Sequence, residues 1–345
     1  MAQHESNNPA ARIGKFKGEI LGHAVGVEVL GITGQQRAIP KNNGKTVVYR
    51  RYLPHGAANT NFNTINRPAV TAASHELVEG VTPTADSLTP QDITAVIKQY
   101  GCLYQLTDQT ADTYEDDVPA EMKKHCGERV GLLREMIRYG VIKGCTNVFF
   151  AGGTSRATVG AKITLNLLRK ISRSLQANHT KRVTGILAPS TQIATKPVEA
   201  SYLVFVHTDA EADIRDLPGF VHVSAYGSRK PVHAQELGSC ESFRFITSPE
   251  LAPYAAAGAD VASTGLMGTA KVDVYPFIVA GEDAWGQLAL RGSDSIDPTY
   301  IPPGVKDKSD PLGQRGYIGA KFYMNAMLLN EGWMAVAEAG VSELL

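Results

Sequence analysis

A long stripe of apolar residues dominates the middle of the chain. Asp116 and Asp117 precede this stripe, Pro119 lies in its first turn, and Gly144 follows its end, all of which are typical of helix boundaries. The spacing predicts one amphipathic helix from Asp116 to Lys143, whose apolar stripe of about 25 residues is roughly 37 Å long at 1.5 Å per residue. The apolar positions recur every three or four residues and are Val118, Met122, Cys126, Val130, Leu133, Ile137 and Val141.

The opposite face of this predicted helix is charged. A mixed-charge helix face is either solvated or in contact with another copy of the chain, and the pattern does not decide between the two. The charged positions are Glu121, Lys123, Lys124, Glu128, Arg134, Glu135 and Arg138.

Two β-rich runs, Lys45–Leu53 (KTVVYRRYL) and Leu88–Thr107, predict a hairpin. Aliphatic, aromatic and arginine side chains mix on both faces of the first run, so neither face is expected to be buried in a core of its own. The second strand spans about 15 residues, roughly 50 Å, which is longer than a small domain. We therefore expect an arm that lies on a neighbouring subunit, with residues 55–84 as the loop at its tip.

The remaining patterns predict a mixed α+β lobe and a return of the chain to the long helix. A second helix follows Thr164, and the Pro- and Asp-containing segment 293–310 is expected to be a hinge. The first 44 residues are polar and are expected to form an extended arm. The other predicted elements are strands at 201–206, 242–247 and 274–280, a short helix at 209–217, and two apolar runs at 317–329 and 333–337 that return to a sheet beside the long helix.

Composition and charge exclude several classes of protein. The 345 residues are 43% hydrophobic, enough for two or three lobes with cores, and 34 Lys+Arg balance 34 Asp+Glu. Zero net charge argues against a protein that coats naked nucleic acid or an anionic membrane. The amino terminus lacks the apolar core of a secretory signal, and no run reaches the roughly 20 apolar residues of a membrane span. We expect synthesis and residence in the cytoplasm, with the four cysteines, which form no CxxC pair, as reduced buried thiols.

Motifs that carry chemistry are scarce. The glycine-rich Ala151–Arg156 (AGGTSR) lacks the ending of a Walker loop and the spacing of a dinucleotide fold, so a tight turn is favoured over a phosphate site. His207, Asp209, Asp213 and His222 match no metal motif, which favours surface or capping roles. No GxSxG or HExxH occurs. The sequence therefore assigns no catalytic, cofactor-binding or metal-binding residue and predicts no cofactor and no enzyme.

Several segments, taken in order, resemble the major capsid proteins of N-four-like tailed phages. The resemblance runs over nearly the whole chain from about Lys45, and the order and spacing of the segments carry it more than any single motif. The segments are KTVVYRRYLP (45–54), EGVTP (79–83), QYG with TD (99–101 and 107–108), GCTNVFFAGG (144–153), LQANHTK (175–181), HTDAEADIRDL (207–217), VYPFIVAGEDAWG (274–286) and GAKFYMNAMLLNEGWMAVAEA (319–339).

The resemblance implies an α+β chain with the Johnson fold, the two-lobed plate named for the coat protein of the Hong Kong ninety-seven phage. Residues 1–44 would be the N-arm, 45–108 the E-loop and its connecting strands, 109–185 the P-domain with its spine helix, 186–310 the A-domain, and 311–345 the return to the P-domain.

The resemblance also implies a function. Copies of the chain would assemble as pentamers and hexamers, through E-loop and N-arm contacts, into the icosahedral head of a tailed double-stranded DNA phage. The protein would be located in the virion after assembly in the host bacterial cytoplasm. Its other partners would be separate scaffolding and portal proteins and the enclosed DNA, with decoration proteins as a further candidate and no membrane. Arg129, Arg134 and Arg138 are candidates for facing that DNA.

Two alternatives stay open at the level of sequence. One is a cytoplasmic α+β enzyme with an unrecognised phosphate site at Ala151–Arg156, which nucleotides would stabilise against heat. The other is a different self-assembling virion protein, a decoration or tail-tube protein, which the symmetry of the assembled object would distinguish from a shell.

Overall fold

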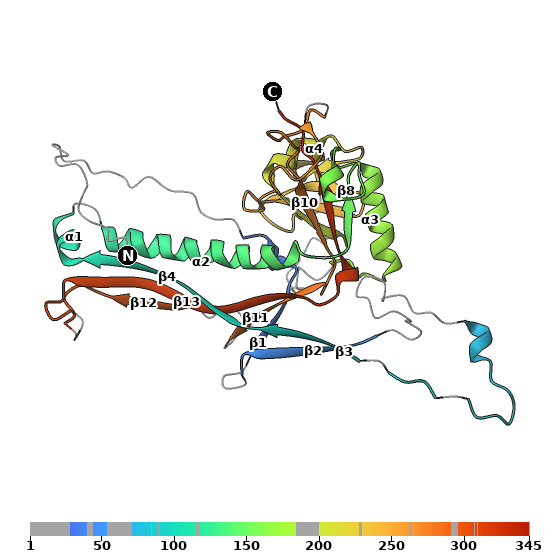
Figure 1. Cartoon of the computed structure of the whole chain (residues 1–345), viewed down its shortest axis with the longest axis horizontal. Coiled ribbons are helices and arrows are strands. Elements are labelled where there is room, and N and C mark those ends of the chain that lie inside the picture. The colour runs from blue at the N-terminus through green and yellow to red at the C-terminus, as the bar shows by residue number, and fades with distance from the viewer. Residues whose placement is uncertain are drawn as a thin grey trace.

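The computed structural model combines an elongated layer, in which one long helix lies along a sheet, with a compact lobe at one end (Figure 1). The predicted N-arm up to residue 27, part of the loop at the hairpin tip and the link at 184–199 lie outside the described residues. The structure describes residues 28–39, 44–53, 71–83, 85–88, 90–114, 117–183, 200–227, 230–261, 264–290, 296–306, 308 and 310–344.

The elongated layer is a five-stranded sheet covered on one face by the long helix α2 (Val118–Ile142). Its longest strand, β13 (Arg315–Leu328), pairs antiparallel with β4 (Lys98–Thr107), β11 (Trp285–Leu290) and β12 (Asp297–Ile301), and β1 (Gln35–Ile39) adds to β11 in parallel. A short helix, α1 (Asp108–Thr113), turns the chain from β4 back into α2. Segments from both ends of the chain therefore build one sheet.

Helix α2 begins and ends close to the predicted residues. The side chain of Asp117 accepts a hydrogen bond from the N–H of Ala120 (3.1 Å) and caps the first turn, while Lys143 caps the last. Met122, Cys126 and Val130 are buried against the sheet, as their spacing predicts. Beyond them the buried positions shift around the helix to include Tyr139 and Ile142, while Leu133, Ile137 and Val141 pack only partly buried.

The charged face of α2 differs from the prediction in one region. Glu135 and Arg138 are buried, at 0% and 2% exposure, because residues 28–33 lie across them. The backbone N–H groups of Val29 and Leu30 donate to the Glu135 carboxylate. The expectation of a face that is either solvated or in contact with another copy is therefore wrong for these two residues.

The predicted hairpin is confirmed in its pairing, with β2 (Thr46–Tyr52) antiparallel to β3 (Pro90–Val96) in a register of Thr46 opposite Val96. The second strand is not continuous, because the chain leaves the ribbon at Ile97 and continues as β4 in the large sheet. One face of the ribbon also packs against the end of that sheet, contrary to expectation. The contributing side chains are Val47, Tyr49, Ile93 and Ala95, in contact with a cluster that contains Ile39, Leu288 and Met327.

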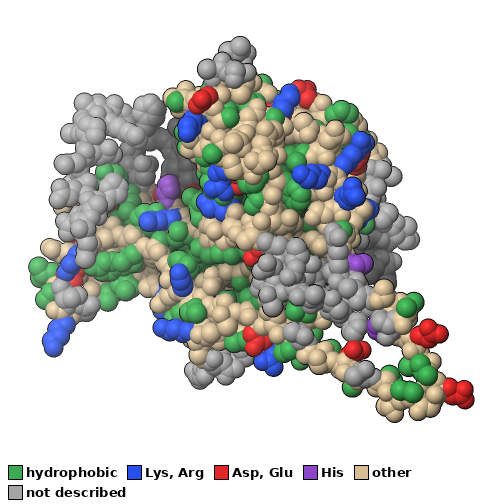
Figure 2. Space-filling view, turned by 45° about the vertical axis from the view of Figure 1, so that its right-hand side comes forward, with side chains coloured by type: hydrophobic (Ala, Val, Ile, Leu, Met, Phe, Trp, Pro, Cys, Tyr) green, Lys and Arg blue, Asp and Glu red, His purple; other side chains and the backbone are tan. Residues whose placement is uncertain are grey.

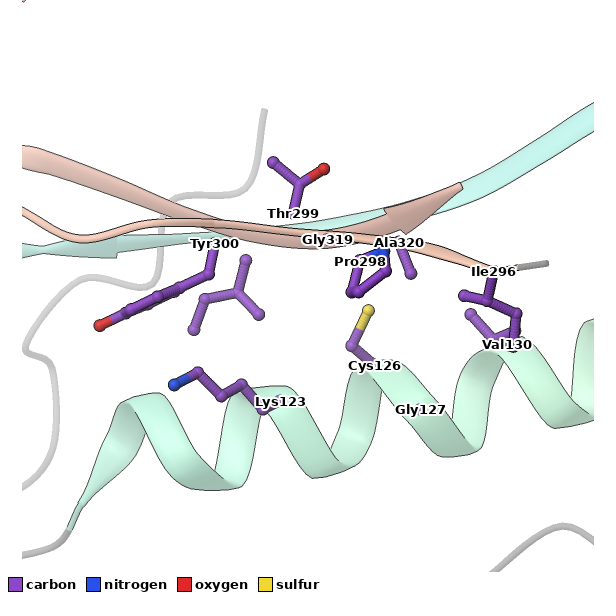
Figure 3. Close-up of a pocket in the computed structure, with 11 residues that line it drawn as sticks. Lys123, Cys126, Gly127, Val130, Ile296, Pro298, Thr299, Tyr300, Gly319 and Ala320 are labelled. Carbon is purple, nitrogen blue, oxygen red and sulfur yellow. The ribbon is translucent and has the colours of Figure 1, made fainter. Parts of the chain in front are cut away.

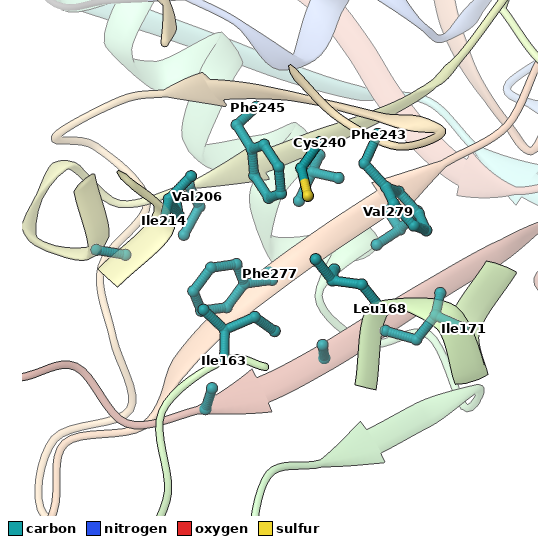
Figure 4. Close-up of a cluster of buried hydrophobic side chains, with 14 of the residues drawn as sticks. Ile163, Leu168, Ile171, Val206, Ile214, Cys240, Phe243, Phe245, Phe277 and Val279 are labelled. Atoms are coloured by element: carbon teal, nitrogen blue, oxygen red, sulfur yellow. The ribbon is translucent and has the colours of Figure 1, made fainter. Parts of the chain in front are cut away.

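The compact lobe is a mixed seven-stranded sheet with two helices on one face. Helix α3 (Leu165–Ala177) is capped by Thr164 as predicted, and α4 (Glu211–Arg215) continues a 3-10 turn at Thr208–Ala210. Both pack on a cluster of aliphatic and aromatic side chains that includes Phe243 and Phe277 (Figure 4). The strands in sheet order are β5 (Val148–Phe150), β14 (Met334–Ala339), β10 (Tyr275–Ala280), β6 (Tyr202–Val206), β9 (Phe243–Thr247), β8 (Glu236–Cys240) and β7 (Val221–His222).

A second buried cluster joins the lobe to the elongated layer. It lies between the other face of the seven-stranded sheet and the carboxyl-terminal end of α2, and it includes Leu30, Tyr139 and Ile278. Trp285, fully buried in this cluster, donates a hydrogen bond from its indole nitrogen to the Thr33 hydroxyl (3.0 Å). The two parts therefore share a continuous core.

Two expectations for the last third of the chain need correction. Segment 293–310, expected to be a hinge, contains strand β12, because an edge of β13 is available for pairing there. The run 333–337 forms most of β14 and joins the sheet of the lobe, whereas 317–329 lies in β13 beside α2 as predicted. None of the described helices is long and apolar enough to cross a bilayer.

Candidate assembly surface

The glycine-rich segment Ala151–Arg156 forms a tight turn. Gly152 adopts a positive φ of 73°, and a Cβ atom there would meet the Ala161 side chain at 2.8 Å, so the turn requires glycine. The guanidinium of Arg156 donates two hydrogen bonds to the Glu338 carboxylate (2.9 and 2.6 Å) and lies 3.7 Å above the Tyr254 ring. The only arginine of the segment is thus already paired with a buried carboxylate rather than free for a phosphate, although its side chain is 42% exposed.

The predicted capping roles of the two histidines are confirmed. The Nδ1 atom of His207 accepts from the N–H of Asp209 (3.1 Å), and that of His222 accepts from Ser224 (3.2 Å). The expected surface or capping role is wrong for Asp213, which is buried and accepts hydrogen bonds from the backbone N–H and the hydroxyl of Ser342. Across the described ranges no group of three His, Cys, Asp or Glu residues is placed to hold a metal ion.

The four cysteines are buried thiols, as predicted. Burial raises the pKa of Cys145 to about 12, and burial together with a contact to Cys102 raises the pKa of Cys126 to about 12. Such thiols are mostly protonated at neutral pH, so each reacts only through a small thiolate fraction and neither is an activated nucleophile.

The molecule does present apolar surface on its hairpin arm, which consists of the β2–β3 ribbon and the loop at 71–88. Val48 and Tyr52 on the outer face of the β2–β3 ribbon are 54% and 57% exposed, beside an ion pair in which Arg50 donates two hydrogen bonds to Asp92. Each strand of this two-stranded ribbon has one edge that no other described strand pairs with. Unpaired strand edges and exposed large apolar residues are features of a surface that another chain covers.

The loop at 71–88 extends this surface away from the body of the molecule (Figures 1 and 2). It carries hydrophobic and acidic side chains and has no Lys or Arg. Sequence patterning predicted a loop that contacts a neighbouring subunit but did not single out its apolar residues, because isolated Leu and Val in a loop give no periodic signal. These residues are Leu77, Val78, Val81 and Leu88, between 63% and 78% exposed.

The arginines of α2 divide into different environments. Arg138 is buried and donates to Glu28 (2.7 Å) and to Gln287 (3.0 Å), so the expectation that it faces DNA is wrong. Arg134 lies 3.8 Å from the Glu28 carboxylate, with a side chain only 13% exposed. Arg129 is exposed, and its guanidinium lies over the Tyr104 ring.

A cavity of about 350 Å³ opens between α2 and the strands β12 and β13 (Figure 3). The Lys123 ammonium lies 4.0 Å from the centre of the Tyr300 ring at one end. The Cys126 side chain points from the helix toward Pro298 on the strand. Its walls are mostly apolar, and they come from segments about 170 residues apart, too far for any local pattern to indicate.

Comparison with known proteins shows which proteins the chain is similar to. No family model matches the chain. The chain is 20% identical to the major capsid protein of Pseudomonas phage KPP21 over an alignment of 339 residues, which covers 86% of this chain and 85% of that protein.

Solved capsid structures agree over the whole length. The capsid of cyanophage P-SCSP1u superposes with a TM-score of 0.60 at 12% identity, covering 96% of this chain and 94% of that one. The capsid of Ralstonia phage GP4 gives 0.59 at 10% identity, covering 98% and 100%. The head structure of Helicobacter pylori bacteriophage KHP40 gives 0.56 at 12% identity, covering 99% and 100%.

The chain has the fold of tailed-phage capsid proteins, so the predicted fold class is confirmed. The predicted resemblance to phage major capsid proteins is confirmed as well.

Proposed function

We propose that this protein is the major capsid protein of a tailed double-stranded DNA phage, and that its copies assemble as pentamers and hexamers into an icosahedral head. The observation that carries the proposal is agreement over nearly the full length of the chain with capsid structures and with one phage major capsid protein in sequence. The protein then belongs to the virion, and its role is mechanical rather than catalytic.

The physical basis of assembly is surface that a single chain cannot bury. Stable protein–protein contacts bury about 1,200–2,000 Å² in total, and an arm that reaches onto a neighbour adds area without enlarging the core. The exposed face of β2–β3 and the loop at 71–88 supply apolar area, and the ribbon has edges that no further described strand pairs with. Zero net charge lets identical copies pack without strong mutual repulsion.

The domain assignment follows from the same proposal. Residues 1–44 act as the N-arm, 45–108 as the E-loop and its connecting strands, and 109–185 as the P-domain with α2 as its spine helix. Residues 186–310 form the A-domain, and 311–345 return to the P-domain through β13 only, with β14 in the sheet of the compact lobe. Strands β11 and β12 fall within the A-domain range but pair with β13, which argues for drawing the A-domain boundary before Trp285.

Other proteins complete the proposed head. We propose a separate scaffolding protein that guides assembly and a portal protein at one vertex. Decoration proteins on the outer surface and double-stranded DNA inside are the remaining proposed partners.

The test is electron microscopy of the full-length protein, expressed alone and with its phage's scaffolding protein, together with mass from light scattering. Closed polyhedral shells or rings of five or six copies are expected. Helical tubes would assign the protein to a tail tube instead.

A small particle under both conditions, combined with a rise in melting temperature on adding nucleotide, would overturn the proposal in favour of an enzyme at Ala151–Arg156. The internal ion pair of Arg156 with Glu338 argues against that outcome.

A further inference from the structure

Two cysteines from different elements meet between α2 and the sheet. The Sγ atoms of Cys102 on β4 and Cys126 on α2 are 2.7 Å apart, and the Cys102 thiol also lies 3.7 Å from the Cys126 carbonyl oxygen. Non-bonded heavy atoms usually keep about 3.5–4.0 Å apart, whereas bonded sulfurs are about 2.05 Å apart. The two sulfur atoms would therefore have to approach each other by less than an ångström to form a disulfide bond.

The packing around the pair fixes this approach. Both residues belong to one buried cluster with Val130, Phe322 and Met324, so neither side chain can swing out to solvent without opening the core. Cys102 stands opposite Ala320 in the β4–β13 ladder, which sets its position along the helix.

The other two cysteines have different neighbours. The Cys145 thiol is closest to the carbonyl oxygens of Glu331 and Met334, at 3.8 and 3.9 Å. The Cys240 thiol lies 3.7 Å from the Pro218 carbonyl oxygen. Only Cys102 and Cys126, of the four cysteines in the chain, contact each other.

A route for a small reagent leads to one of the two sulfurs. Cys126 lines the cavity of about 350 Å³ between α2 and β12, and its sulfur points into the space below Pro298 (Figure 3). Cavities of roughly 300–1,000 Å³ hold small organic molecules. A compact neutral oxidant that enters this cavity thus meets the Cys126 sulfur.

We propose that Cys102 and Cys126 are a latent redox staple, which closes to an intrachain disulfide between β4 and α2 when the protein meets a small oxidant. With a diazene such as diamide, the Cys126 thiol adds across the N=N bond and forms an S–N bond. The Cys102 sulfur then attacks Cys126, the S–S bond forms as the S–N bond breaks, and the hydrazine leaves. Two thiols lose two electrons and two protons, and the diazene gains both.

The consequence is a covalent tie across the interface that carries the longest helix. The bond closes a loop that runs from β4 through α1 into the third turn of α2, and such loops stabilise a protein chiefly by restricting its unfolded chain. The pairing rests on the local geometry alone. Its timing rests on the proposed function, since a phage protein is made in a reducing cytoplasm and released into an oxidising medium.

The experiment uses the full-length wild-type protein in its native state. The protein is treated with diamide, free thiols are blocked with N-ethylmaleimide in denaturant, and the products are digested without reduction for mass spectrometry. We expect two of the four thiols to disappear, with one cross-linked species joining the peptides of Cys102 and Cys126. Four unchanged thiols, or a disulfide that joins other cysteines or two chains, would overturn the proposal.

Variants separate the pair from general oxidation. C102S and C126S each remove one partner, so their three remaining thiols should all stay free after the same treatment. C240S is the matched control, because it removes a buried cysteine outside the pair and should still lose two thiols. Oxidation should raise the urea midpoint of wild type and C240S and leave that of C102S and C126S unchanged.

The readouts require no assembled particle. Failure of the protein to form shells would count against the proposed function and would leave the staple standing, whereas absence of the cross-linked species would remove the staple and leave the capsid proposal standing.

Discussion

Glu135 holds the first described segment of the chain against the middle of α2. One carboxylate oxygen accepts from the N–H groups of Val29 (3.0 Å) and Leu30 (2.9 Å), and the other accepts from Arg138 (3.3 Å). The guanidinium of Arg138 also binds Glu28 and Gln287. A carboxylate buried this deeply is tolerated only because each of its oxygens is satisfied.

Removing this carboxylate should be costly. E135A removes the one fully buried carboxylate that contacts the buried Arg138 charge and leaves two N–H groups without an acceptor, so we expect a loss of about 3–5 kcal/mol in the free energy of unfolding. K124A, an exposed substitution on the same helix, should change it by less than about 0.5 kcal/mol. Urea unfolding followed by circular dichroism measures both. Equal urea midpoints for the two variants would show that the hydrogen bonds of Glu135 do not stabilise the fold.

Cys145 should make the protein less stable in alkali. Burial raises the pKa of its thiol to about 12, while an unfolded thiol titrates near about 8.5. Between these values the folded state keeps the proton and the unfolded state has lost it, so the free energy of unfolding falls as pH rises, by roughly 1.4 kcal/mol per pH unit.

C145S lacks this titration. Its free energy of unfolding should therefore fall less steeply than that of wild type between pH 8.5 and pH 10.5, measured by urea unfolding at each pH. K124A serves as the control and should follow the wild-type slope, since Lys124 is exposed. A C145S slope indistinguishable from wild type would show that Cys145 is not the source.

At the scale of elements, the β2–β3 ribbon has one face for its own chain and one face for another. Val47 packs on the cluster at the end of the large sheet, whereas the neighbouring Val48 points outward and is 54% exposed. V47T places a hydroxyl in that cluster and should cost about 1–2 kcal/mol. V48T should cost less than about 0.5 kcal/mol in the isolated chain, because solvent meets the new hydroxyl.

An assembly assay should give the opposite order, with the larger effect on shell yield from substitutions on the outer face of the ribbon. V48T combined with Y52T removes apolar area from the outer face and should lower the yield of shells in sedimentation, while its monomer melts like wild type. V47T should instead lower the melting temperature of the unassembled chain. If the outer-face double variant assembles at the wild-type yield, this face is not an interface.

Elements with a local signal were predictable from the sequence. Helices α2 and α3 follow from apolar residues at a spacing of 3.6 together with the caps Asp117 and Thr164, and the pairing of β2 with β3 follows from two β-rich runs. The burial of Glu135 and Arg138 was not predictable, because the segment that covers them lies more than 100 residues earlier. Strand β12 gave no signal either, since its pairing depends on the free edge of β13.

The candidate surface was only partly predictable, because contacts between segments far apart in the sequence decide which of its residues are covered. Alternation in Lys45–Leu53 shows that both faces of the ribbon carry apolar residues, but not that the Val47 face meets the end of the large sheet. The meeting of Cys102 with Cys126 depends on how β4 and α2 cross, which no periodicity specifies.

At the scale of the whole molecule, the arm and the body have separate tasks. The body has a continuous core through Trp285 and Tyr139, to which the loop at 71–88 contributes no residue. The loop at 71–88 contributes exposed apolar side chains and the acidic residues Glu76, Glu79 and Asp86, with no Lys or Arg. A partner for this loop must supply an apolar surface with basic residues at its edge.

This separation predicts a variant that folds but does not assemble. L77S/V78S/V81S removes exposed apolar area only, so the melting temperature of the unassembled chain should stay within about 2 °C of wild type, as for surface changes of less than about 0.5 kcal/mol. Closed shells should fail to form when the variant is expressed with scaffolding protein, as seen by electron microscopy. T82A, in the same loop, is the control and should form normal shells. Normal shells from the triple variant would mean that this loop buries no apolar surface on a neighbour, and the interface would then have to lie on the ribbon face of Val48 and Tyr52.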